Sequence, residues 1–387
     1  MLFNANKRER KSFLLSGKIR PFDLSFFILT LILAVFGSLM VFSAGSAYAE
    51  FRYDNRFFFV SRQAIWFVIG IAVMLFASKI KPSFYFYVTP YLYVITLCLL
   101  ILVLAVGLVG NGAQRWISIG PITIQPSEIA KMTIVMALAY YFSVYEDKAL
   151  ERKRLKKKFI YGTLIPCVII AVPIFLVMLQ KHLSCIIILG LIGILVIVAS
   201  GIDTKYISVF TLIGGIGVAC IALFTDYTKD RITVWQNPEG YKLTGGWQTL
   251  QGLMAIGSGG LFGLGYGKSL LKYCYVSEPA NDMIFAILCE ELGFSGALVT
   301  ILLFSLLTLR GYKLALNAEN VFERLVIFGV CTKIAVQVLL NIAVVTNTIP
   351  NTGISLPFFS YGGSSLIMIF FEIGMILSFS RNAKITK

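Results

Sequence analysis

Long apolar stretches constrain this chain more than any other feature of its sequence. A stretch must reach about 20 residues to cross the hydrocarbon core of a bilayer. The sequence contains about ten such stretches, separated by short polar breaks, and 58% of its residues are hydrophobic. The core of a soluble protein does not need so large a fraction of hydrophobic residues. We therefore predict an all-α polytopic membrane protein and exclude a secreted or cytosolic enzyme.

The basic residues predict how the chain is oriented. The predicted spans are residues 24–44, 63–78, 86–107, 124–144, 159–178, 183–200, 206–224, 282–308, 325–346 and 358–379. With the N-terminus in the cytoplasm, 22 of the 34 Lys and Arg fall on cytoplasmic segments, 10 outside and 2 within spans. This matches the positive-inside rule and places both termini in the cytoplasm. The basic run 151–158 then anchors the topology near anionic lipid, and no nucleic-acid partner is expected.

The predicted organisation is one membrane domain, residues 23–380, between basic cytoplasmic tails at 1–22 and 381–387. Its one long loop, residues 225–281, is extracytoplasmic and joins the seventh and eighth spans. Trp235, Trp247 and Phe262 supply apolar surface there, so we expect short amphipathic helices on the outer surface. The loop also contains Gly267-Lys268-Ser269, but Phe262 stands where a nucleotide-binding loop needs glycine. No nucleotide or organic cofactor is expected.

Ionisable residues within the spans are the first candidates for a functional site, because charges at membrane depth are costly. They are Glu128, Lys131, Glu290, Glu291, Lys333 and Glu372. Glu128 and Lys131 are three positions apart, so they share one helix face and can pair. The pair is either functional or a structural link between helices. The single histidine, His182, has no second histidine nearby, which argues against a metal site there.

Two further segments add polar groups on the same side. Asp282 opens the eighth span, either as a helix cap or as a functional carboxylate. Residues 350–365 are dense in Gly, Pro and hydroxyl groups, and such irregular backbone needs protein or a wet cavity around it at membrane depth. Together with the start of the fourth span, these segments predict a cavity open to the outside.

Four motifs in this order resemble the SEDS family (shape, elongation, division and sporulation), the membrane peptidoglycan glycosyltransferases typified by FtsW, RodA and SpoVE. The motifs are Asn111–Trp116 with Gln125–Lys131, Ala255–Gly263, Asn281–Ala286 with Glu290–Gly293, and Thr352–Ser365. The segments Gly265–Ser269 with Lys272 and Ser43–Gly45 look more like the FtsW and SpoVE branch. The resemblance covers nearly the whole chain.

The resemblance implies an enzyme that polymerises lipid II into β-1,4 glycan strands on the outer face of the bacterial cytoplasmic membrane. Asp282 matches the family's catalytic carboxylate and would act as general base in an inverting displacement of undecaprenyl diphosphate. Arg115, Lys131 or a divalent cation, Mg²⁺ or Mn²⁺, would face the diphosphate. The expected partners are a class B penicillin-binding transpeptidase and other division or sporulation membrane proteins.

The candidate site residues fall into two further groups. Those expected at the substrate are Arg115, Glu128, Lys131, Ser360, Gly362, Ser364 and Ser365. Those expected to support the site are Gln125, Ser127, Glu290 and Glu291. The chain departs from many members at Lys181-His182, where they have Pro-Asp, and at Ser277, where they have Pro.

Two other functions remain open: a lipid II flippase and a scaffold that only recruits a transpeptidase. The sequence does not distinguish septal, lateral and spore-cortex synthesis. It also leaves the metal requirement and the oligomeric state open.

Overall fold

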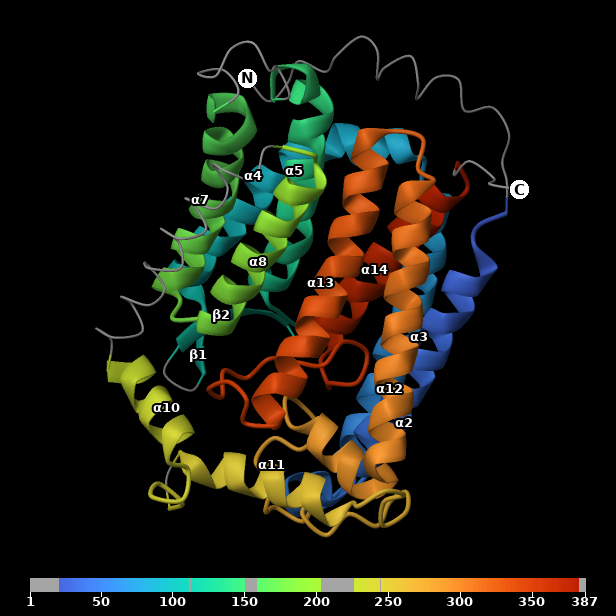
Figure 1. Ribbon diagram of the computed structural model, residues 1–387. Coiled ribbons are helices and arrows are strands. Elements are labelled where there is room, and N and C mark those ends of the chain that lie inside the picture. Colours follow the sequence, from blue (N-terminus) through green and yellow to red (C-terminus); the bar gives the residue numbers. More distant parts are fainter. Residues whose placement is uncertain are drawn as a thin grey trace.

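The computed structural model describes residues 21–110, 113–120, 122–149, 159–202, 226–243 and 245–382. Its long helices run side by side as a bundle (Figure 1). Within this part of the chain, seven helical segments are long and apolar enough to cross a membrane. They are α2 (Leu24–Tyr53), α3 (Phe58–Lys79), α4 (Pro82–Val106), the π-helix η1 (Ile160–Leu164) continued by α7 (Ile165–Leu179), α12 (Ile284–Leu316), α13 (Val321–Val345) and α14 (Gly363–Ser380).

Two more helices stand among them, α5 (Pro126–Ala149) and α8 (Leu183–Ala199), at the positions predicted for the fourth and sixth spans. The prediction of a polytopic, mainly helical membrane fold is therefore confirmed. The predicted span 206–224, the basic run 151–158, residues 1–20 and residues 383–387 lie outside the described residues.

Several predicted boundaries were wrong by a helical turn or more. Helices α4 and α13 begin four residues earlier than predicted, and α2 and α12 end at Tyr53 and Leu316, nine and eight residues later than predicted. The second helix begins at Phe58 and not at residue 63, and the guanidinium of Arg62 lies 4.0 Å from the Phe58 ring centre, within the helix. The last helix begins at Gly363 and not at residue 358. Phe358 has a left-handed backbone, and the Ser360 hydroxyl accepts a hydrogen bond from Leu356 N, so residues 357–360 form a turn and not the start of the helix.

A small antiparallel sheet adds to the helical fold and was not predicted. Its strands β1 (Leu108–Gly110), β2 (Ala113–Ile119) and β3 (Ile122–Ile124) are arranged in the order β1-β2-β3. Ile117 pairs with Ile124 across β2 and β3. The sheet connects α4 to α5 and positions the segment that carries Arg115 and Trp116.

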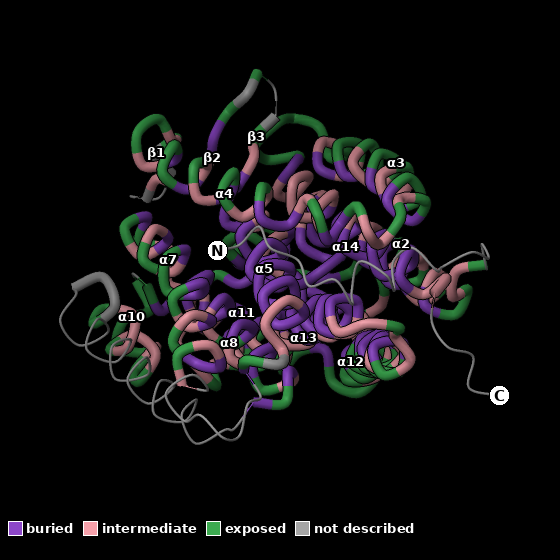
Figure 2. Tube along the Cα trace, turned by 90° about the horizontal axis from the view of Figure 1, so that it is seen from above, coloured by how far each residue is buried: buried purple, intermediate pink, exposed green. Residues whose placement is uncertain are grey.

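The centre of the bundle is formed by α5, α13 and α14, where buried residues gather in Figure 2. Every residue from Ala130 to Ser143 in α5 is buried. In the apolar windows of α13 and α14, 67% and 61% of residues are buried, against 17% in α3. The outer helices turn apolar residues such as Val68 and Phe76 outward, as expected for a lipid-facing surface.

In its described residues, the segment between α8 and α12 contains two short helices, α10 (Asp226–Gln236) and α11 (Gly246–Ser258), in the region where short helices were expected. After α11, residues 259–265 pack against a break in α12 at Gly293, whose φ is 68°. Leu264 N donates to Glu290 O at 3.0 Å, and Phe294 N donates to Gly260 O at 2.9 Å. The loop thus pairs with the backbone groups that the break in α12 leaves open.

The start of α2 and the end of α14 meet at one end of the bundle. Asp23 N donates to the Ser380 hydroxyl at 3.1 Å, and the Asp23 carboxylate pairs with Arg310 of α12. The first and last described helices therefore approach the same side. Helices α10 and α11 lie at the opposite end (Figure 1).

Candidate active site

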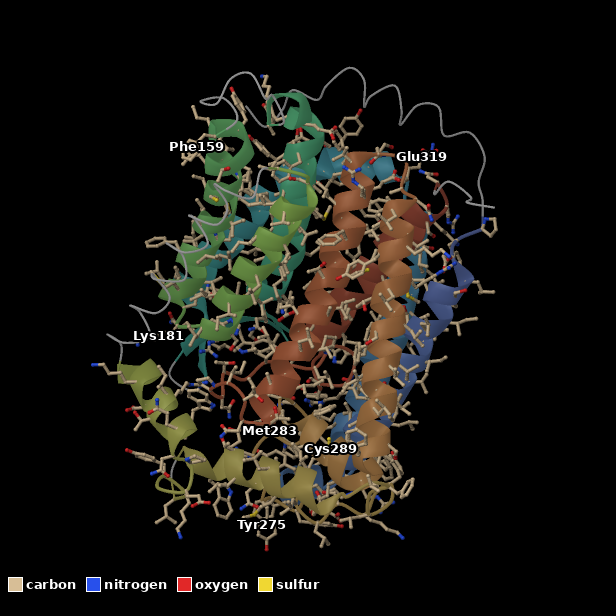
Figure 3. All side chains as sticks on the ribbon, viewed as in Figure 1. Phe159, Lys181, Tyr275, Met283, Cys289 and Glu319 are labelled. Atoms are coloured by element: carbon tan, nitrogen blue, oxygen red, sulfur yellow. The ribbon has the colours of Figure 1, made fainter. Side chains whose placement is uncertain are left out.

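A cavity of about 620 Å³ opens in the half of the bundle that carries α10 and α11. Figure 3 labels Lys181 and Met283, the chain neighbours of the lining residues His182 and Asp282, in this half. The predicted site residues that line the cavity are Arg115, Gln125, Glu128, Lys131, Asp282, Ser360, Gly362, Ser364 and Ser365. The structure therefore brings together three segments that are far apart in the sequence.

The first turns of three helices contribute to the cavity wall. Glu128 lies in the first turn of α5, Ser184 in that of α8 and Ser364 in that of α14. The N-terminal end of a helix carries a partial positive charge and unpaired N–H groups. Three such ends facing one cavity favour an anionic ligand.

Basic side chains add full positive charges. Arg62, Arg115 and Lys131 line the cavity. Arg115 Nη2 donates to Lys181 O at 2.5 Å, while its buried Nε has no hydrogen-bond partner. Lys131 Nζ donates to Glu128 Oε1 at 2.7 Å, which confirms that the two side chains can pair. The Lys181 carbonyl therefore orients the guanidinium of Arg115, which adds its positive charge to the cavity wall.

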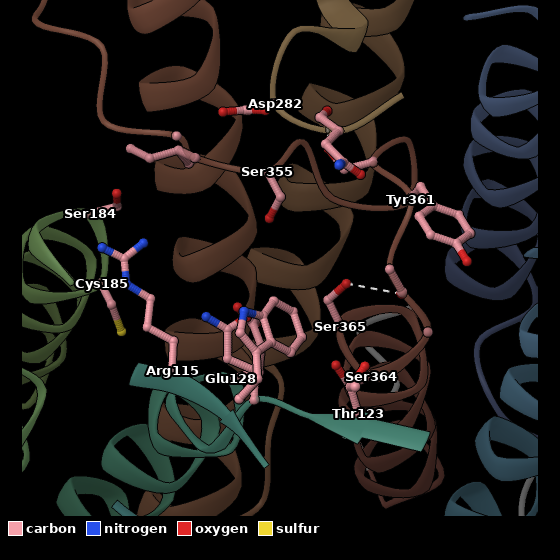
Figure 4. Close-up of a pocket in the computed structure, with 18 of the residues that line it drawn as sticks. Arg115, Thr123, Glu128, Ser184, Cys185, Asp282, Ser355, Tyr361, Ser364 and Ser365 are labelled. Carbon is pink, nitrogen blue, oxygen red and sulfur yellow. Dashed lines mark hydrogen bonds between the residues drawn. The ribbon is translucent and has the colours of Figure 1, made fainter. Parts of the chain in front are cut away.

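Asp282 lies across the cavity from this basic wall. In Figure 4, Arg115 and Glu128 are on one side and Asp282 is on the other. Burial raises the pKa of Asp282 to about 6, and the charge of Glu278 adds to the rise, while the backbone N–H of Asp282 and Arg231 oppose it. At neutral pH such a carboxylate is mostly ionised and still basic enough to accept a proton.

The backbone around Asp282 is held by the side chain of Asn341 on α13. Its amide nitrogen donates to Asp282 O at 2.9 Å and to Ile354 O at 2.6 Å. Gly353 lies against the carboxylate: its φ is 66°, and a Cβ there would lie 3.1 Å from Asp282 Oδ2. A glycine at this position leaves space beside the carboxylate.

The segment before α14 is braced against the segment before α12. The Ser360 hydroxyl donates to Asn281 O and accepts from Leu356 N, both at 2.7 Å. Tyr361 N donates to Ala280 O at 2.8 Å. The Ser365 hydroxyl donates to Gly362 O at 3.1 Å (Figure 4). Because the Ser360 hydroxyl is engaged by backbone, it shapes the wall of the cavity.

The turn before α8 places a neutral imidazole at the cavity. Burial lowers the pKa of His182 to about 3, and the charges of Arg115 and Lys131 add to this effect. Ser127, which does not line the cavity, lies behind it with its hydroxyl 3.4 Å from His182 Nδ1. His182 is therefore uncharged at physiological pH.

Glu290 and Glu291 lie away from the cavity and hold the loop that follows α11. Glu291 accepts from Lys272 Nζ at 2.9 Å and from the Ser43 hydroxyl of α2 at 2.6 Å. Glu290 accepts from the Ser269 hydroxyl at 2.5 Å and from the backbone N–H of residue 270 at 2.9 Å. Both carboxylates thereby fix the loop to α12.

Several lining residues were not among the sequence candidates. They are Arg62, Trp66, His182, Asn281, Gln337 and Tyr361, among others. Arg62 was assigned to a loop, but α3 already includes it. Arg62 and Trp66 are four residues apart, so both lie on one helix face. This spacing was the sequence signal that could have identified Arg62 as a site residue.

The described residues contain no group of three or more His, Cys, Asp or Glu side chains that could hold a metal ion. A divalent cation held by the protein alone therefore does not fit the described part of the site.

Comparisons with known proteins agree with the motifs. The family model for the FtsW/RodA/SpoVE cell cycle proteins matches residues 23–385. Stage V sporulation protein E of Bacillus subtilis is 38% identical over 364 residues, which cover 94% of this chain and 98% of that protein. The probable peptidoglycan glycosyltransferase FtsW of Geobacter metallireducens is 33% identical over 370 residues, covering 95% and 96%.

Two solved structures share the fold. A chain of a peptidoglycan synthase complex, described as coordinating polymerization and crosslinking, has a TM-score of 0.76 and 26% identity over 93% of this chain and 98% of that one. The rod shape determining protein RodA of Thermus thermophilus has a TM-score of 0.68 and 26% identity over 94% and 97%. The predicted resemblance is confirmed, and the chain belongs to the FtsW/RodA/SpoVE family of cell cycle proteins.

Proposed function

We propose that this protein is a peptidoglycan glycosyltransferase that polymerises lipid II into β-1,4 glycan strands. One observation carries the proposal: a carboxylate with a pKa of about 6, Asp282, shares one cavity with three basic side chains and three helix N-terminal ends. Further support comes from the FtsW proteins of three Geobacter strains, which are named as probable peptidoglycan glycosyltransferases.

In the proposed reaction, a hydroxyl oxygen of the acceptor sugar forms a bond to the anomeric carbon of the donor. The bond from that carbon to the diphosphate oxygen breaks, and the diphosphate leaves with the electron pair. The hydroxyl proton passes to Asp282, which acts as general base. One displacement at the anomeric carbon inverts its configuration.

The position of Asp282 opposite the basic wall suits this displacement, because the nucleophile attacks the anomeric carbon from the side opposite to the leaving group. Arg115, Lys131 and the first turn of α14 would stabilise the negative charge that develops on the diphosphate. Ser364 and Ser365 add hydroxyl groups in that turn. These residues are the proposed diphosphate contacts.

We place the cavity on the outer face of the bacterial cytoplasmic membrane, facing a class B penicillin-binding transpeptidase as partner. The distribution of Lys and Arg supports this orientation. The similarity to a chain from a complex described as coordinating polymerization and crosslinking supports the partner. Other division or sporulation membrane proteins would join the same assembly.

The test is gel-resolved polymerisation of labelled lipid II by the purified full-length protein and by Asp282→Asn. Reactions are run with and without the transpeptidase, and with and without Mg²⁺ or Mn²⁺. We expect polymer from the wild type and none from a folded Asp282→Asn. Equal rates for the two would reject Asp282 as the base. No polymer from the wild type under any condition would favour a flippase or a scaffold. A vesicle assay of lipid II accessibility then distinguishes the flippase from the scaffold.

A further inference from the structure

Another buried ion pair lies deeper in the bundle than the cavity. Lys333 of α13 pairs with Glu372 of α14, and their side chains are only 4% and 0% exposed. Neither residue lines the cavity. Ionisable groups at membrane depth are costly and usually serve a function. Neither residue of this pair has a role in the proposed mechanism.

A small void lies between Lys333 of this pair and Glu128 of the Lys131–Glu128 pair. Its volume is about 20 Å³, enough for one water-sized group. It is lined by Glu128, Lys333, Gln337, Ser360 and Ser365, with neighbouring residues of the turn before α14. All five except Lys333 also line the cavity. Glu372 interacts electrostatically with both Lys131 and Glu128. The four charges therefore form one array, from the cavity wall to the bundle centre.

The charge balance of this array changes when an anionic ligand binds. At rest it contains two lysines and two carboxylates and is neutral. A ligand that bonds Lys131 competes with Glu128, and a buried carboxylate that loses its cation is strongly destabilised. Lys333 is the cation that lines the void beside Glu128.

Lys333 has the donors needed to bind a second carboxylate. An ammonium group has three N–H donors, and the hydrogen bond to Glu372 Oε2 engages one of them. The other oxygen of Glu372, Oε1, is buried without a hydrogen-bond partner, so the pair is not closed by further contacts. The long stem of a lysine allows its head to move into the void.

We propose that Lys333, held by Glu372, becomes the counter-ion of Glu128 when Lys131 turns to an anionic ligand in the cavity. The proposal rests on the proposed function, in which that ligand is the diphosphate of the lipid-linked donor. Lys333 is then a positioning residue: it acts through Glu128 and Lys131 and does not touch the substrate.

The test compares binding of inorganic pyrophosphate and the KM for lipid II between the full-length wild type and the double variant Lys333→Met/Glu372→Gln. The double variant removes both charges at once, so no buried charge is left unpaired. We expect at least a tenfold rise in the pyrophosphate Kd and a similar rise in KM, with kcat changed less than threefold. An unchanged Kd would overturn the proposal.

A matched control removes an equally buried pair away from the cavity. Lys272 and Glu291 have side chains 3% and 0% exposed. Lys272→Met/Glu291→Gln should lower the Tm while pyrophosphate affinity stays within about twofold of wild type. Equal losses of affinity in the two double variants would assign the effect to general destabilisation and reject a specific role for Lys333.

Two further variants keep the test decisive. In a Glu128→Gln background no replacement cation is needed, so the added double substitution should no longer weaken pyrophosphate binding. Glu372→Gln alone retains Lys333 and should bind pyrophosphate at least as tightly as the wild type. Weaker pyrophosphate binding by a folded Glu372→Gln would contradict the proposal. This single variant therefore tests the proposal even if the double variant does not fold.

Lys131→Met separates this inference from the proposed function. If Lys131→Met leaves pyrophosphate affinity unchanged, the proposed diphosphate contact itself is wrong. If Lys131→Met weakens binding while Lys333→Met/Glu372→Gln does not, only the role of Lys333 is wrong.

Discussion

At the scale of single residues, the environment of Asp282 determines what this carboxylate can do. Burial and the nearby charge of Glu278 raise its pKa to about 6. Asn341 fixes its backbone, and Gly353 leaves space beside its oxygen atoms. A surface carboxylate would be a weaker base, because its pKa would lie near 4. The site therefore shifts the pKa of an ordinary aspartate toward neutral pH.

The pH dependence of polymerisation should follow this tuning. We expect kcat to fall as the pH drops through about 6, because protonated Asp282 cannot accept a proton. Glu278→Gln removes a charge that raises this pKa, so its acid limb should move to lower pH. Polymerisation rates of the wild type and of Glu278→Gln, measured from pH 4.5 to 8, locate both acid limbs. An acid limb that moves to higher pH in Glu278→Gln would contradict the assignment.

The same carboxylate should reduce stability. Its folded pKa lies above the unfolded value, so the folded state retains a proton that the unfolded state loses between about pH 4 and 6, and stability falls across this window as the pH rises. Asp282→Asn removes this loss. We expect the variant to be more stable than wild type by about 1–3 kcal/mol at pH 7 and by little at pH 4. Thermal unfolding of both proteins in detergent at the two pH values measures the difference. A gain that is larger at pH 4 would have the wrong sign.

At the scale of elements, the loop after α11 and the break in α12 form one unit. Gly263 has a φ of 77°, and a Cβ there would lie 2.2 Å from Glu291 O. The loop backbone donates to Glu290 O and accepts from Phe294 N, so it fills the break in the helix that Asp282 precedes. The loop therefore supports the segment that carries the proposed base.

Replacing this glycine should separate close packing from backbone conformation. Gly263→Ala combines a left-handed backbone with a clash against main chain, and we expect a loss of about 2–4 kcal/mol. Gly267 also has a positive φ, 80°, but nothing lies within 4 Å of its missing Cβ. Gly267→Ala should therefore cost only about 1 kcal/mol. Unfolding of both variants in detergent measures the difference, and equal losses would mean that the contact with α12 adds nothing.

At the scale of the whole molecule, apolar length predicted the membrane helices well, because crossing a bilayer imposes a minimum length on each. The pairing of Lys131 with Glu128 also followed from spacing, because it is local to one helix. The sheet before α5 was missed, since two of its strands, β1 and β3, have only three residues, too few for periodicity to reveal. The positions of Arg62 and Gln337 on the cavity wall depend on how α3 and α13 pack, which no single segment encodes.

Orientation in the membrane is the property of the whole molecule on which the proposed function depends most. Cys274 is free and exposed, in the segment between α11 and α12 at the cavity end of the bundle. If this end faces outward, a membrane-impermeant maleimide should label Cys274 in intact spheroplasts, and Cys274→Ser should lose that labelling.

The opposite end provides the matched position. Glu319 is exposed between α12 and α13, so Glu319→Cys in the Cys274→Ser background should be labelled only after permeabilisation. The reverse pattern would turn the cavity toward the cytoplasm. Asp282 could then not act on lipid II at the outer face, and the proposed function would fail as a whole.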